Sequence, residues 1–112
     1  MGLVTTHGAF EGSYSSFNQW RRAVAAAAGI DLSSLRGYGG REDWPEEKDE
    51  PLVAILSHSD CDGSLLWKSL IRLAARLESL IPEMPPEHAE TTAAFAKGCR
   101  LAFSQWEDID FR

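Results

Sequence analysis

The chain has 112 residues, a formal net charge of −6 and a hydrophobic content of 44%, which is an ordinary composition for one globular domain over residues 1–112. The acidic balance argues against direct binding of nucleic acid, and no apolar run reaches the ~20 residues that a membrane span needs. The two cysteines are too few for the disulfide framework of a small secreted domain, so we expect free thiols and a cytoplasmic protein.

The N-terminal part of the chain predicts a short strand followed by a helix. Residues 2–10 contain the β-branched and aromatic types that strands favour. Over 14–28 the apolar residues recur at helical spacing, behind the turn and N-cap residues of 12–16 and ahead of Gly29. A short turn capped by Asp31 follows, and the glycines of 37–40 end it.

The C-terminal part predicts two further long helices. The apolar run 52–56 favours a short helix, because Pro51 after two acids is typical of a helix start. Long helices are expected over 65–81 and 87–105, the first with a solvated basic face of Lys68, Arg72 and Arg76, the second with Cys99 packed on its inner face. Residues 106–111 alternate apolar and acidic residues and could pair with 2–10. The predicted class is therefore mainly α (α+β), with three principal helices and a small two-stranded terminal sheet.

Most of the negative charge lies in one segment. Residues 42–50 contain six acids and one lysine, so this stretch holds −5 of the net charge of −6. A solvated loop would account for it. Trp44 lies within the segment, and tryptophan is enriched at interface hot spots. We therefore predict a docking surface for a basic protein partner, made of Trp44, Glu42, Asp43, Glu46 and Glu47.

The loop 57–63 brings the most potential ligands together. The simpler interpretation is structural: Asp60 and Asp62 accept backbone N–H bonds and cap the next helix, and Gly63 supplies a positive φ. The alternative is a degenerate EF-hand over 58–69 that binds Ca²⁺, with His58, Asp60 and Asp62 at positions 1, 3 and 5. Ser69 stands where the bidentate glutamate belongs, so the structural interpretation is preferred and no cofactor is expected.

Catalytic chemistry has less support in the sequence. A zinc site at His58 and Cys61 would have crowded spacing and lacks a C-x-x-C partner. The H-x-D-x-D-G pattern resembles the first motif of DHH-type phosphoesterases, but the further ligands of a two-metal centre are absent from this sequence. There is no G-x-S-x-G elbow and no glycine-rich phosphate loop. We predict no catalytic residues and expect that the protein is not an enzyme.

Several motifs resemble those of a group of small bacterial proteins that has no assigned activity. The group shares S-Y-S-x-F-N-x-W-R, G-x-G-G and H-S-D-C-D-G motifs and an acidic–apolar end in Phe; here these are residues 13–21, 37–40, 58–63 and 110–111. The resemblance spans nearly the whole chain. Its relatives carry acids just after D-C-D-G, where this chain has Ser64, Leu65 and Leu66.

Four tryptophans in a small chain, an acidic segment and the lack of a catalytic motif together favour a binding protein. We expect a non-enzymatic cytoplasmic domain of the inhibitor or immunity type that binds a basic protein. A small metal-binding protein centred on the 58–69 loop is the alternative.

Overall fold

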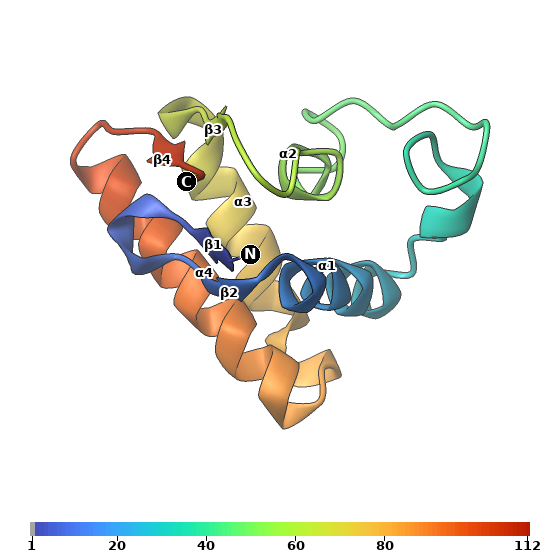
Figure 1. Cartoon of the computed structure of the whole chain (residues 1–112), viewed down its shortest axis with the longest axis horizontal. Helices are drawn as coiled ribbons and strands as arrows, with labels where there is room; N and C mark the ends of the chain where they lie inside the picture. The colour runs from blue at the N-terminus through green and yellow to red at the C-terminus, as the bar shows by residue number, and fades with distance from the viewer. Residues whose placement is uncertain (1) are drawn as a thin grey trace.

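Helices dominate the computed structural model, which describes residues 2–112 (Figure 1). The long helices are α1 (Tyr14–Ala28), α3 (Trp67–Leu80) and α4 (Pro86–Ser104). Shorter elements lie around them: α2 (Val53–Leu56) and the 3-10 turns η1 (Thr6–Gly8), η2 (Leu32–Ser34) and η3 (Ile81–Glu83). Together with two small sheets they form a mainly helical α+β fold. The predicted class is confirmed, and each long helix begins and ends within two residues of its predicted bounds.

Helix α1 has local signals at both ends. The Ser13 side chain accepts a hydrogen bond from the N–H of Ser16, and Gly29 ends the helix in the left-handed conformation with φ 75°. Between these ends Phe17, Trp20 and Val24 are buried, as their helical spacing predicts. Because these signals come from neighbouring residues, the sequence alone was sufficient to place this helix.

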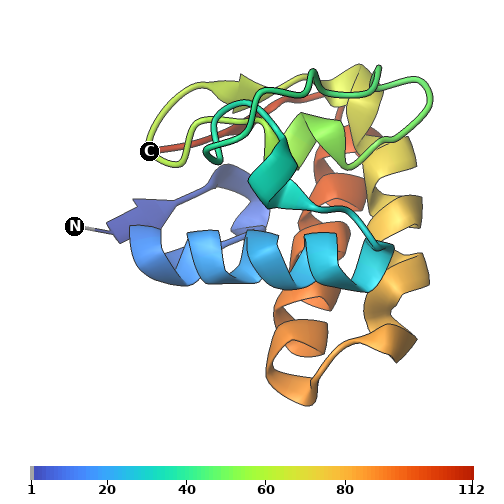
Figure 2. The same cartoon turned by 90° about the vertical axis from the view of Figure 1, so that its right-hand side faces the viewer.

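Helices α3 and α4 form an antiparallel pair, and α1 lies across it (Figure 2). The prolines between α3 and α4 stop the first helix, and Pro86 starts the second at a position where its missing N–H costs nothing. The chain between α1 and α3 crosses one end of the pair and carries α2. None of the helices within residues 2–112 is both long and apolar enough to cross a membrane.

The strands pair differently from the predicted terminal sheet. Strand β1 (Gly2–Val4) pairs with β2 (Glu11–Ser13), while β3 (Ser64–Leu65) pairs with β4 (Ile109–Asp110), both antiparallel. The turn η1, where the φ of His7 is 63°, folds the first segment back on itself. The two end segments meet at one bridge, Thr5 to Phe111, and the backbones of Val4 and Arg112 exchange hydrogen bonds of 3.1 and 2.8 Å. The predicted strand over 2–10 is therefore a hairpin.

The start of α3 is capped from the other end of the sequence. We expected Asp60 and Asp62 to cap this helix, and that expectation was wrong. Asp108 Oδ1 instead accepts the N–H of Trp67 at 2.8 Å, across 41 residues. The β3–β4 pairing brings Asp108 to this position, which explains why a search of neighbouring residues did not find it.

Aromatic side chains form the centre of the core. The rings of Trp20 and Phe95 stack at 4.8 Å, and Phe17 contacts both Phe10 and Phe111 edge-on. The indole N–H of Trp20 donates to Thr92 Oγ1 at 2.9 Å, so its buried polar atom is satisfied. The core thus joins α1 to α4 and both chain ends to α1.

Candidate functional site

The loop 57–63 is held by different contacts from those predicted. Asp60 Oδ2 accepts the side-chain N–H of Asn18 at 3.0 Å and no backbone N–H, and Asp62 is exposed without a hydrogen bond to residues 2–112. The expectation that both aspartates cap the next helix was therefore wrong. Gly63 does have a positive φ, 87°, as predicted.

His58 is fixed by backbone groups and by an aromatic contact. Its Nδ1 lies 2.7 Å from the carbonyl oxygen of Ser59, and its Nε2 lies 3.0 Å from that of Ser64. Its ring packs on Phe111 at 4.2 Å between centroids. Both nitrogens therefore lie next to carbonyl oxygens at the two ends of the loop, and a neutral ring donates to one of them.

The predicted calcium ligands are therefore turned toward different partners. Among residues 2–112, no three His, Cys, Asp or Glu side chains gather as the ligands of one ion. His58 binds backbone carbonyls and Asp60 binds Asn18. The calcium hypothesis remains a prediction, and it would require the loop to rearrange.

The acidic segment is exposed along most of its length. Glu42, Asp43, Glu46 and Glu47 are all exposed. Asp43 pairs with Arg36 at 2.8 Å and Glu46 with Lys48 at 3.1 Å. In residues 2–112, Glu47 has no ion-pair partner, so it is available to a basic group.

The far end of the segment is anchored on the basic face of α3. Both carboxylate oxygens of Glu50 accept hydrogen bonds from the Arg76 guanidinium, at 3.0 to 3.3 Å. Arg72 donates to the backbone carbonyl of Lys48 at 2.5 Å. Lys68 and Arg72 are exposed, as the expected solvated face requires, but Arg72 and Arg76 also hold the segment.

Trp44 anchors the near end of the segment. Its indole N–H donates to the carbonyl of Arg36 at 3.0 Å, and its ring meets Tyr38 edge-on at 6.0 Å. The side chain is half-buried and packs against the core. Trp44 therefore gives the segment a fixed path, and its remaining exposed surface faces a cleft.

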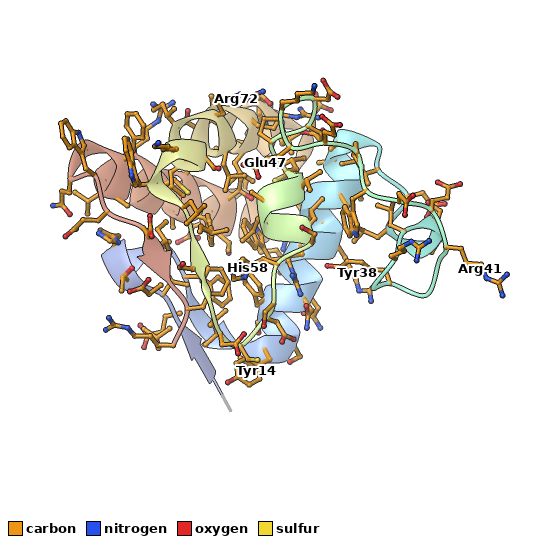
Figure 3. All side chains as sticks on the ribbon, turned by 90° about the horizontal axis from the view of Figure 1, so that it is seen from above. Tyr14, Tyr38, Arg41, Glu47, His58 and Arg72 are labelled. Atoms are coloured by element: carbon orange, nitrogen blue, oxygen red, sulfur yellow. The ribbon has the colours of Figure 1, made fainter. Side chains whose placement is uncertain are left out.

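This cleft, of about 420 Å³, lies where three sequence motifs meet. Its lining comes from α1, from the loop after η2 and from the loop after α2; it comprises Asn18, Arg21, Arg22, Arg36, Gly37, Tyr38, Trp44, Leu56, Ser57, His58, Ser59 and Asp60. Figure 3 labels Tyr38 and His58, which come from the segments before and after α2. The first motif contributes Asn18 and Arg21, the second Gly37 and Tyr38, and the third His58 to Asp60.

Arg21 connects the parts of this cleft from within. It is 5% exposed, and one of its terminal nitrogens donates to the carbonyls of Ile55, Leu56 and His58 at 3.3, 3.5 and 2.6 Å. The other donates to Asn18 Oδ1, so the Asn18 amide stands between Arg21 and Asp60. The Arg21 Nε is buried without a partner among the described residues.

The electrostatics of Arg21 and Tyr38 follow from this burial. Desolvation lowers the pKa of the Arg21 guanidinium, and the nearby Tyr38 and Asp60 act in the opposite direction. Burial disfavours the charged form of Tyr38 as well, which raises the pKa of its hydroxyl. This hydroxyl donates to the carbonyl of Leu56 at 2.8 Å. The guanidinium also lies 4.8 Å from the centre of the Phe17 ring.

Sequence reasoning did not select Arg21 as a site residue, although a signal was present. Arg21 follows Phe17 by four positions, which places it on the apolar face of α1. A charged residue on a buried face needs polar partners, because an unpaired charge is costly to bury. The carbonyl partners of Arg21 could not be named because they lie more than 30 residues away.

A second groove, of about 410 Å³, lies on the other side of α2. Its walls come from α2 and the loop after it, from β3 and from the start of α3. Half of its lining residues are apolar, namely Val53, Ala54, Leu65, Leu66, Leu70 and Leu73, and serines and His58 make up most of the rest. Glu47 of the acidic segment also lines it, and Leu66 is 64% exposed. Figure 3 shows Glu47 beside α2. The groove therefore combines an apolar wall with an acidic edge.

Comparisons of the chain with protein-family models, with curated proteins and with solved structures returned no match.

Proposed function

We propose that this chain is a non-enzymatic cytoplasmic domain that binds another protein, of the inhibitor or immunity type, and that the partner presents a basic surface. The observation that carries the proposal is the exposed acidic segment, which borders a groove with one apolar wall through Glu47. Interfaces of this kind combine an apolar centre with a charged rim.

The charge of the segment supports a basic partner. Asp43 and Glu46 form ion pairs with Arg36 and Lys48, and all four side chains are exposed. Exposed ion pairs contribute little to stability, so their partners can be replaced readily. An incoming lysine or arginine can therefore take their place at low cost. Acids concentrated in one region also speed the encounter with a basic protein.

The path of the segment supports binding because it is already ordered. Trp44 holds one end and the Glu50–Arg76 pair holds the other, so docking does not have to order a free loop. Preorganisation of this kind lowers the entropic cost of association. The groove beside Glu47, with the exposed Leu66, fits an apolar side chain of the partner that neighbours a basic one.

The test compares partners captured by three forms of the purified protein. One is the wild type and the second carries E42Q, D43N, E46Q and E47Q. The third is a control with the same change of charge at exposed acids elsewhere, E11Q, E83Q, E87Q and E90Q. We expect a partner retained by the wild type and the control but lost from the segment variant. With that partner purified, the segment variant should bind at least about tenfold more weakly.

A further substitution distinguishes the contribution of the groove to binding from that of general charge attraction. Leu66→Ala removes exposed apolar surface without changing charge, and should weaken the same complex by about fivefold or more. Equal recovery of every captured protein by all three baits would contradict the proposed surface. If the partner is lost from the control variant as well as from the segment variant, binding depends on the net charge of the protein and not on the acidic segment.

A further inference from the structure

The first cleft is positively charged although the molecule is acidic. Its lining includes Arg21, Arg22 and Arg36, and Asp60 is its one carboxylate among residues 2–112. The whole chain has a net charge of −6. Three guanidinium groups around one cleft repel each other unless an anion lies between them. Their arrangement therefore needs an explanation beyond general surface composition.

Arg21 has a structural role, and that role leaves its charge uncompensated. It donates to the carbonyls at the end of α2 and to Asn18, which are all neutral groups. The nearest carboxylate, Asp60, contacts the far side of the Asn18 amide. A buried cation without a direct ion pair makes the floor of the cleft electrostatically favourable to an anion.

Arg22 and Arg36 are the groups available for direct contact. Arg22 is exposed, and it makes no hydrogen bond or ion pair with residues 2–112; its guanidinium lies 5.6 Å from the centre of the Tyr38 ring. Arg36 pairs with Asp43, but the side chains of this pair are 67% and 86% exposed. Such a pair contributes little to stability, so a ligand in the cleft can displace Asp43.

The donors point to one chemical class of ligand. Guanidinium groups present two parallel N–H donors that match the oxygens of carboxylates and phosphates. Tyr38 and Trp44 supply aromatic surface beside these donors, and the cleft volume lies in the range of small-molecule sites.

We propose that this cleft binds a small molecule through an oxyanion, a carboxylate or a phosphate, held by Arg22 and Arg36 above the buried Arg21. This site goes beyond the proposed protein-binding surface and does not rest on it. The lining of the cleft comes from three segments that lie far apart in sequence, 18–22, 36–44 and 56–60.

The experiment titrates the wild-type protein with inorganic phosphate and, separately, with citrate. Ionic strength is held constant with sodium chloride, and binding is measured by calorimetry and by the midpoint of thermal unfolding. We expect saturable binding of at least one probe, with a rise in that midpoint. Phosphate alone indicates a phosphate-bearing ligand, citrate alone a carboxylate-bearing one, and both together the shared oxyanion chemistry.

Matched arginine variants locate the site. Arg22→Gln and Arg36→Gln should each weaken binding by about tenfold, because each removes a charge-assisted donor. Arg41→Gln is the control: its side chain points away from the molecule in Figure 3 and does not line the cleft. Arg21 is left unchanged, since its removal would disturb the fold. Absence of saturable binding of both probes by the wild type overturns the proposal, and so does an equal loss in Arg41→Gln.

Discussion

Cys61 and Cys99 show how strongly the environment of a single residue sets its chemistry. Cys61 is exposed in the 57–63 loop, whereas Cys99 is buried in the inner face of α4, and both are free thiols as expected. Burial raises the pKa of the Cys99 thiol to about 12. At pH 8 almost all of Cys99 is therefore protonated, and it is also out of reach of a reagent.

This difference predicts the course of thiol labelling. With Ellman's reagent at pH 8, the folded protein should release one equivalent of the coloured product quickly and the second only after unfolding. Cys61→Ser should abolish the fast phase, and Cys99→Ala should leave it intact. Fast reaction of two thiols in the folded protein would mean that α4 opens far more readily than its packing indicates.

At the scale of residues, the sequence predicts which positions of α1 are buried but not which groups Arg21 contacts. The buried positions of α1 follow from helical spacing, which depends on adjacent residues alone. The partners of Arg21 depend on how α2 returns to α1, which no spacing in the sequence encodes. Sequence analysis found His58, Asp60 and Trp44, but it placed them in two separate sites, whereas the structure puts all three around one cleft.

At the scale of elements, the start of α3 is the feature that differs most from expectation. Its cap comes from Asp108 and not from the preceding loop. We expect Asp108→Ala to lower the free energy of unfolding by about 1 kcal/mol, the usual contribution of a helix cap. Asp62→Ala, which removes an exposed carboxylate, should change it by less than about 0.5 kcal/mol.

Urea unfolding of the two variants beside the wild type measures both values. The comparison is informative because the sequence predicted the cap at Asp62, whereas the structure places it at Asp108. A larger loss from Asp62→Ala than from Asp108→Ala would restore the cap that the sequence suggested.

Helices were predicted better than strand pairings, because helix signals are local in sequence and strand partners are distant. Helix bounds were predicted to within two residues because caps, prolines and apolar spacing are local. The predicted pairing of 106–111 with 2–10 is realised only at the Thr5–Phe111 bridge. The β3–β4 pairing was missed, because these strands are only two residues long and lie more than 40 residues apart. The alternation over 106–111 correctly indicated extended chain only over 109–111, since Trp106 lies in a turn with φ 58°.

At the scale of the whole molecule, the N-terminal segment docks closely on α4 at Gly98. A Cβ built at this position would lie 2.7 Å from both the Cα and the Cβ of Ala9. Replacing a helical glycine by alanine ordinarily stabilises a helix by up to about 1 kcal/mol. Here the close approach reverses the sign, and we expect Gly98→Ala to destabilise the protein by about 1–3 kcal/mol.

Thermal or urea unfolding of Gly98→Ala tests this reversal, with Lys97→Ala at the neighbouring exposed position as the control. The control should remain within about 0.5 kcal/mol of the wild type. A stabilised Gly98→Ala variant would show that the N-terminal segment does not rest on α4.

The meeting of residues 108–111 with the start of α3, with His58 and with Thr5 also sets an order of events during folding. The α3–α4 pair connects neighbours in sequence and can close early, while these contacts span 41 to 106 residues and carry the larger loop-closure entropy. A chain stopped at the early stage would have two paired helices but would lack the packing of His58 on Phe111 and the Asp108 cap of α3. We therefore expect the contacts of residues 108–111 to form late in folding, after the α3–α4 pair has closed.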